Sequence, residues 1–365
     1  MNLCAPITSP PPTAESYLRQ RSAALLPGGP ALQNIVELAA GVWQINLADG
    51  SKQVAKDQAH GWLAAGTAHD LLAVERQMLD LLVAAACPVP RILAIDPEMQ
   101  FIFFEHRGDR TLDDMCQENA TGLQTLARHI ISGFCQIERT LATHIEVLDS
   151  LIHPVATLKH LRSTIDHIGA QAHSGLDYLL NSSAASAPRA DLHDLLDRIV
   201  QHSGATAPSL GSIDYNARNI VVDRATRRPS FIEFAKLGWD WPERRLVQYL
   251  TSLGGGHPNG RFHSLVNPNS AKWYARCAGG DAADRILALD SHHILFHLNA
   301  AALLSKALET PQQPPHARLL QRWRQPQRRM QQLARALSQN LSTAAPTAHF
   351  RNLLSHTINS GEKQL

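Results

Sequence analysis

Lys56 and Glu75 have the residue types and the spacing of a cation that is held in place to bind phosphate. Lys56 ends the short run Val54-Ala55, which is typical of a strand. Glu75 lies in the segment 69–85, whose apolar residues recur at helical spacing. A carboxylate on a helix can orient a flexible strand lysine toward phosphate oxygens. The alternative interpretation is that both are solvated surface charges, as most single Lys and Glu residues are.

A second group of polar residues has the types needed to move a phosphoryl group. Asp214 and Asn219 form the pattern D-x-x-x-x-N directly before the apolar run 220–222. The carboxylate of Asp214 would deprotonate an acceptor hydroxyl, and the amide oxygen of Asn219 would coordinate Mg²⁺. Glu233 ends the next strand-like run, and a hairpin would bring it to the same edge as a second Mg²⁺ ligand. The pattern D-x-x-x-x-N often arises by chance, and a Glu at a strand end is commonly solvated. What favours a function for Asp214, Asn219 and Glu233 is therefore their position in the chain.

The elements that would position these residues form a β-rich first part and a helical second part. Residues 31–107 predict five strands, at 35–38, 42–47, 53–56, 91–95 and 101–104, with one helix between the third and the fourth. Residues 108–365 predict mainly helices, with long ones at 122–148 and 155–180, and a small hairpin at 220–234. Residues 1–30 are rich in Pro and Gly and predict a flexible lead-in. This order predicts an α+β fold with a small antiparallel β lobe and a larger helical lobe, with a ligand cleft between the two lobes.

Two further segments resemble the aminoglycoside/choline phosphotransferase family of the protein-kinase-like superfamily. The segment 87–93, Cys-Pro-Val-Pro-Arg-Ile-Leu, resembles the passage that precedes the fourth strand in these enzymes. The segment 101–112 resembles their hinge strand and the turn after it. The resemblance runs from about residue 34 to residue 245 and implies a bilobal protein-kinase-like fold that binds ATP and Mg²⁺.

The resemblance also implies a role for each candidate residue. Lys56 would contact the α- and β-phosphates of ATP, and Glu75 would position Lys56. Backbone groups around Glu105, His106 and Arg107 would meet the adenine ring. Asp214 falls where the family has its catalytic base. Asn219 and Glu233 fall where it has its two metal ligands.

The catalytic part of the chain departs from the family pattern at three places. The family has His-Gly-Asp where this chain has Ser212-Ile213-Asp214, so the histidine that braces the loop is absent. We expect Ser212 to be too small to replace it. The metal-binding acid of the family is Asp, whereas Glu233 is one methylene longer, and Arg245 stands near the place of a later aspartate. These departures leave open a catalytically impaired pseudokinase that acts as a nucleotide-binding or scaffold module.

The composition argues against several other classes of protein. The chain has 365 residues, 44% of them hydrophobic, and 34 Lys+Arg against 32 Asp+Glu leave a formal charge of +2. No overall positive field therefore attracts nucleic acid. The five cysteines are isolated from one another, which argues against a disulfide framework and favours the cytoplasm. We find no signal peptide and no apolar run of roughly 18 residues, so no membrane span is expected.

Three other patterns have a plainer interpretation than function. The glycine-rich segment 254–260 follows a helical stretch rather than a strand, which predicts a flexible turn. His293 and His297 are four apart on a predicted helix, but Ile294 stands where the metal motif H-E-x-x-H has its glutamate. They are therefore interpreted as ordinary helix histidines. The arginine-rich segment 318–335 predicts one amphipathic helix with a solvated arginine face, and binding of an acidic partner or RNA is its alternative.

The function that the sequence favours is Mg²⁺-dependent phosphoryl transfer from ATP to a hydroxyl of a small molecule. The resemblance implies a sugar, an amino alcohol or a related metabolite as the acceptor. The alternatives are the pseudokinase and a protein that binds its partner through segment 318–335. No pattern in the chain addresses the oligomeric state. If Lys56 contacts phosphate, Lys56→Met should weaken nucleotide binding and leave the melting temperature nearly unchanged.

Overall fold

The computed structural model describes residues 16–19, 30–58, 69–181, 188–255, 257 and 260–362. Contacts within the chain divide it into two compact units. The first unit comprises Met1–Asp80 and Pro90–His106, and the second comprises Leu81–Val89 and Arg107–Leu365. Within the described ranges, no helix is long and apolar enough to cross a membrane.

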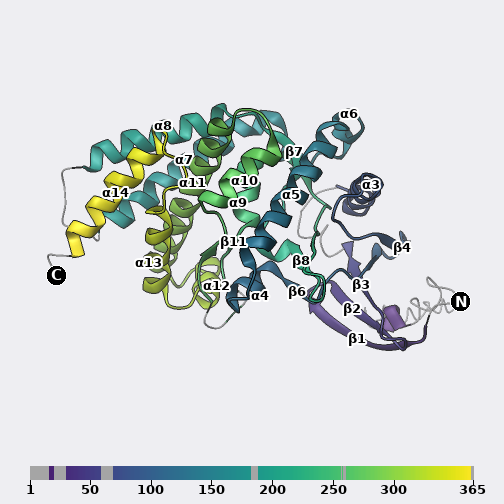
Figure 1. The fold of residues 1–365 in the computed structure, drawn as a ribbon. Helices are drawn as coiled ribbons and strands as arrows, with labels where there is room; N and C mark the ends of the chain where they lie inside the picture. Colours follow the sequence, from purple (N-terminus) through teal and green to yellow (C-terminus); the bar gives the residue numbers. More distant parts are fainter. Residues whose placement is uncertain are drawn as a thin grey trace, which may run out of the picture. The chain divides into compact units, whose positions relative to one another are not determined.

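The first unit is built on a five-stranded antiparallel sheet (Figure 1). Its elements are β1 (Leu32–Ala39), β2 (Val42–Leu47), β3 (Lys52–Asp57), α3 (Leu71–Ala84, which continues into the second unit), β4 (Ile92–Asp96) and β5 (Phe101–Glu105). The strand order β1-β2-β3-β5-β4 places β3 in the centre, where Lys56 pairs with Val42 on one side and Ile102 on the other. The five strands predicted from the alternating sequence are therefore confirmed.

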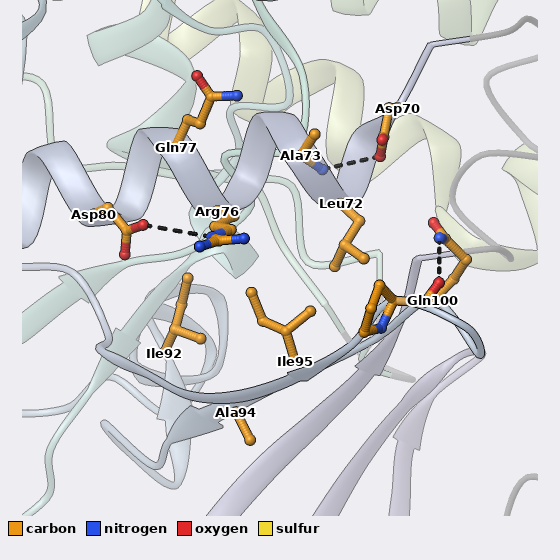
Figure 2. Close-up of a pocket in the computed structure, with 11 residues that line it drawn as sticks. Asp70, Leu72, Ala73, Arg76, Gln77, Asp80, Ile92, Ala94, Ile95 and Gln100 are labelled. Carbon is orange, nitrogen blue, oxygen red and sulfur yellow. Dashed lines mark hydrogen bonds and ion pairs between the residues drawn. The ribbon is translucent and has the colours of Figure 1, made fainter.

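The sheet and its helix follow from local sequence signals. Ser51 donates its backbone N–H to Asp49 at 2.9 Å, and Gly50 takes φ +83°, which closes the turn between β2 and β3. Asp70 accepts the backbone N–H of Ala73 at 2.9 Å and so caps the start of α3 (Figure 2).

Apolar side chains on one face of the sheet form the core of the first unit. Ile45, Ala55 and Phe103 are buried there, and Tyr17 packs on Phe101 with ring centroids 4.9 Å apart. Tyr17 belongs to the short helix at 16–19, so this part of the predicted flexible lead-in is packed. The rest of the lead-in, apart from Pro30, lies outside the described residues.

The second unit is mainly helical. Its helices are α4 (Leu112–Gln117), α5 (Leu123–Ala142), α6 (Ile145–Leu148), α7 (Leu161–Asn181), α8 (Arg189–Ala205), α9 (Pro242–Tyr249), α10 (Pro268–Ala278), α11 (Ala282–Glu309), α12 (Pro314–Arg322), α13 (Pro326–Leu337) and α14 (Thr347–Glu362), with 3₁₀ turns at Asp149–Leu151, Leu158–His160 and Ala217–Asn219. Its strands are β6 (Arg110–Thr111), β7 (Ser209–Ser212), β8 (Ile220–Val222), β9 (Pro229–Phe231), β10 (Leu237–Asp240), β11 (Thr251–Ser252) and β12 (His263–Ser264). The long helix α11 packs against α7 and is buried along most of its length (Figure 1). His293 and His297 both lie in this buried stretch, so of the two expected settings, helix surface or core, they occupy the core.

Several predicted elements of this unit are wrong in their bounds. The helix expected at 122–148 is interrupted between α5 and α6, and the arginine-rich segment forms two helices because Pro326 starts α13. The segment 254–260 follows the short strand β11 rather than a helix, and residues 256, 258 and 259 lie outside the described part. The strands β7 and β10, which pair antiparallel with Ser212 opposite Leu237, were not predicted.

Candidate functional site

Two candidate residues of the first unit, Lys56 and Glu75, form a buried ion pair. Lys56 Nζ lies 3.0 Å from Glu75 Oε2, so the expected contact between strand lysine and helix glutamate is confirmed. The Lys56 side chain is 12% exposed and that of Glu75 only 2%. Gln58, also buried, donates its Nε2 to the same carboxylate oxygen. Two donors thus offset the desolvation of the Glu75 carboxylate, and the ammonium is fixed at the end of the central strand.

Glu105 is the last residue of β5, and its side chain binds Arg91, the residue before β4. Its carboxylate accepts the backbone N–H of Arg91 at 2.7 Å and Arg91 Nε at 3.2 Å. Its own backbone N–H donates to the Arg91 carbonyl at 3.0 Å, so this amide is committed to the sheet. The boundary between the units falls between His106 and Arg107, and within the second unit Arg107 donates to the Val89 carbonyl at 3.3 Å. An adenine contact by the three residues stays a prediction.

In the second unit, the loop after β7 brings Asp214 and Asn219 together. Asn219 Nδ2 donates to the Asp214 carbonyl at 2.6 Å and to Asp214 Oδ1 at 3.2 Å. The Asn219 backbone N–H donates to the Asn216 carbonyl at 3.0 Å and closes a 3₁₀ turn. Because the amide nitrogen of Asn219 is used inside the loop, its oxygen is the side-chain atom left to bind a cation. The Asp214 side chain remains 41% exposed.

Ser212 braces this loop. Its Oγ donates to the Glu233 carbonyl at 2.8 Å and accepts the Asp214 backbone N–H at 3.2 Å. The Ile213 backbone N–H donates to the Lys236 carbonyl at 3.0 Å, which extends the pairing of β7 with β10. The expectation that a serine is too small to brace the loop is therefore wrong, because the two segments lie close enough for a hydroxyl to join them.

Glu233 lies in the loop between β9 and β10 rather than at a strand end, because β9 stops at Phe231. It has φ +68°, a conformation that is unusual for a residue other than glycine and that is enriched at functional sites. The backbone N–H of Ile232 donates to the Asn219 carbonyl at 2.9 Å, which joins the two predicted metal-binding segments. Within the described ranges, no group of three or more His, Cys, Asp or Glu residues could hold a metal ion. Two oxygen ligands still fit Mg²⁺, which takes few protein ligands when phosphates and water complete its shell.

Lys236 is a candidate that sequence reasoning missed. Its Nζ lies 3.7 Å from Asp214 Oδ2, and its side chain is 31% exposed. The only signal in the sequence is a lysine three residues after Glu233. The pairing of β7 with β10, which places Lys236 beside the loop, has no clear sequence pattern.

A separate hollow lies in the first unit between α3 and the β4 segment (Figure 2). Its volume is about 760 Å³, and Leu72, Arg76, Ile92 and Ile95 are among its lining residues. Arg76 forms an ion pair across one turn of α3 with Asp80, at 3.8 Å. None of the candidate site residues that the sequence predicts lines this hollow.

Comparison with known proteins supports the fold. The sequence matches no family model and no curated protein. Two similar solved structures are GDP complexes of aminoglycoside 2′-phosphotransferase-IIIa, one of a mutant and one of the wild type. The mutant complex has a TM-score of 0.52 and 15% identity over 86% of this chain and 97% of that one. The wild-type complex has a TM-score of 0.53 and 13% identity over 86% and 98%.

A choline/ethanolamine kinase family protein from Mesorhizobium loti is also similar, with a TM-score of 0.46 and 16% identity over 93% of this chain and 98% of that one. At these identities the likeness concerns the fold alone, and the likeness to the two GDP complexes, whose TM-scores exceed 0.5, agrees with the antiparallel sheet and the mainly helical unit described above. The chain therefore has the α+β, protein-kinase-like fold of the aminoglycoside phosphotransferases.

Proposed function

We propose that this protein transfers a phosphoryl group from ATP, with Mg²⁺, to a hydroxyl of a small molecule. The observation that carries the proposal is the ordered loop from Ser212 to Asn219. It fixes the backbone of Asp214 by hydrogen bonds at 2.6 and 3.2 Å while its carboxylate stays 41% exposed. A general base needs this combination of a fixed position and access to the acceptor.

In the proposed reaction Asp214 accepts the proton of the acceptor hydroxyl. The hydroxyl oxygen forms a bond to the γ-phosphorus, the bond from that phosphorus to the β–γ bridging oxygen breaks, and ADP leaves. Lys56, oriented by Glu75, would bind α- and β-phosphate oxygens. Lys236, 3.7 Å from Asp214 Oδ2, would attract the carboxylate and restrain its orientation.

Asn219 and Glu233 would hold the Mg²⁺, which neutralises charge on the phosphates when it is bound. Backbone groups near Glu105, His106 and Arg107 would bind the adenine. Because two structural neighbours are GDP complexes, GTP must be tested beside ATP. The described cysteines are all free thiols, which supports the cytoplasm as the proposed location.

The test is nucleotide-dependent phosphorylation of a panel of hydroxyl compounds, followed by ³¹P NMR. We expect Mg²⁺-dependent formation of a phosphate ester by the wild type, with ATP or GTP as the donor. The matched control is Asp214→Asn, which keeps the size of the side chain but removes its charge. Binding of nucleotide by both proteins, with no acceptor-dependent transfer by either, would replace the enzyme with the pseudokinase alternative.

A further inference from the structure

Arg218 lies in the candidate catalytic loop, beside Asn219, and part of its side chain is uncommitted. Its side chain is 48% exposed, and its Nε lies 3.5 Å from Asp113 Oδ2. Within the described ranges, the Arg218 side chain donates no hydrogen bond. Asp113 is buried and its Oδ1 accepts Ser252 Oγ at 2.6 Å, so its ion pair with Arg218 is made through Oδ2 and the Nε of the guanidinium. The terminal nitrogens of Arg218 can therefore bind a ligand.

A second donor lies next to Arg218, across Gly255. A Cβ built on Gly255 would lie 3.7 Å from Arg218 Nη2 and 3.4 Å from the indole Nε1 of Trp323. A single small group beside Gly255 would therefore touch both donors. Trp323 lies between α12 and α13, and its Nε1 makes no hydrogen bond with any described residue.

Arg329 fixes the corner of the second unit that is formed by Gly255, Arg218 and Trp323. It is 1% exposed and donates to the carbonyls of Leu253 at 2.5 Å, Gly254 at 3.3 Å and Arg324 at 3.1 Å. Its guanidinium carbon lies 5.8 Å from the centre of the Trp323 ring. Burial lowers the pKa of Arg329 to about 10, so it remains charged near neutral pH. A buried positive charge bonded to carbonyls rather than to a carboxylate thus lies against the Trp323 ring.

The charges around this corner are those of an anion site. The chain has six arginines and no Asp or Glu from residue 310 to residue 350, and Arg322 and Arg324 are exposed on either side of Trp323 in the sequence. The nearby acids are already paired, Asp113 as described above and Asp114 with His257 at 3.1 Å. An added cation would meet like charge here, whereas an added anion would find two donors and positive charge on both sides.

We propose that Arg218 and Trp323 bind an anionic group, a phosphate or a carboxylate, on the acceptor molecule. This inference rests on the proposed function, because Arg218 lies in the same hydrogen-bonded loop as Asp214. The acceptor would then be an acidic hydroxyl compound. Aminoglycosides carry positive charge, so this specificity would differ from that of the aminoglycoside 2′-phosphotransferase-IIIa named in the structural comparison.

The test uses inorganic phosphate as the probe and needs no nucleotide. The protein is labelled with 5-fluorotryptophan, and the ¹⁹F resonance of Trp323 is assigned by its loss in Trp323→Phe. We expect phosphate to shift this resonance to saturation, and Arg218→Gln to weaken binding by roughly tenfold or more. Arg335→Gln, which removes an exposed arginine of α13, is the matched control and should bind phosphate as the wild type does. The other tryptophan resonances report whether each variant keeps its fold.

Two outcomes would overturn the inference. One is the absence of a Trp323 shift, or an equal shift in wild type and Arg218→Gln. The other is Asp214-dependent transfer to choline in preference to sn-glycerol 3-phosphate, which would leave the proposed function standing with a cationic acceptor. The phosphate titration involves no turnover, so its failure is distinguishable from a failure of the proposed phosphoryl transfer.

Discussion

Replacement of Lys56 should reduce stability as well as nucleotide binding, because the partner of Lys56 is buried. In Lys56→Met, the Glu75 carboxylate would lose its ammonium partner and keep the hydrogen bond from Gln58 Nε2, in a site where the Glu75 side chain is 2% exposed. Removal of one partner from a buried ion pair costs about 3–5 kcal/mol. The bond from Gln58 remains, and Lys56 is itself 12% exposed, so we expect the lower end, about 3 kcal/mol. This replaces the sequence-based expectation of a nearly unchanged melting temperature.

The double variant Lys56→Met/Glu75→Gln separates the two effects. A neutral amide at position 75 has no charge to leave buried and can still accept a hydrogen bond from Gln58. We therefore expect the double variant to recover most of the lost free energy of unfolding. Nucleotide binding should stay weak in both variants, because neither has the ammonium. Urea unfolding, with hydrogen exchange in β3 and α3, measures the first effect, and calorimetric titration with ATP and Mg²⁺ measures the second.

Two results would refute this reasoning. If Lys56→Met unfolds at the urea concentration of the wild type, the ion pair does not stabilise the first unit. If the double variant binds ATP as the wild type does, Lys56 is not a phosphate ligand, and the role implied by the family resemblance fails.

Four further predictions concern the second unit. Asp214→Asn should lower kcat by roughly 10²–10⁴ and leave the Kd for nucleotide unchanged, measured by coupled ADP release; an unaffected rate would remove Asp214 from the role of base. Ser212→Ala should lower kcat more than it weakens ATP binding, because it frees the loop; equal effects on both would argue against a brace. Glu233→Asp should keep or improve Mg²⁺ affinity, since Asp tolerates positive φ better than Glu, and a Mg²⁺ titration of ATP binding checks this. Burial lowers the pKa of His292 to about 3 and that of His297 to about 4, so both are neutral when folded and take up a proton on unfolding. Stability should therefore fall as the pH drops below about 6.5, by up to about 1.4 kcal/mol per pH unit for each histidine, and a urea midpoint that is constant between pH 7 and pH 5 would contradict this.

The first unit could be predicted largely from its sequence. Its strands alternate apolar and polar residues, and the Asp49-Gly50 turn sets the pairing of β2 with β3. Once β3 was placed, the helical spacing around Glu75 was enough to predict its contact with Lys56. These signals are local, so they can be interpreted without knowledge of the rest of the chain.

The site in the second unit depends on contacts that the local sequence does not encode. The strands β7 and β10 are four residues each and are mixed in polarity, so neither alternation nor length reveals them. Without that pairing, Lys236 cannot be placed beside Asp214. Glu233 was predicted at a strand end because its neighbours are apolar, but β9 stops at Phe231, and Phe234 is buried in the loop that follows it. The proposed anion site was not predicted from the sequence for the same reason, since Arg218 and Trp323 lie close together only in the folded unit.

The departures at Ser212 and Arg245 are connected in the structure, which bears on whether the loop is impaired. The Arg245 guanidinium lies under β7, 2.8 Å from where a Cβ on Gly211 would be, and it binds Glu138 at 2.7 Å. Tyr249, whose pKa is raised by burial, lies on the same helix, and its ring packs edge-on against Tyr215 of the loop, with centroids 6.3 Å apart. Arg245 and Tyr249 thus fill the space beneath the loop, and a small residue at 212 can reach the Glu233 carbonyl. A histidine at 212 would have to displace this packing. The serine and the arginine are therefore parts of one alternative support for Asp214, and neither substitution by itself is evidence for a lost activity.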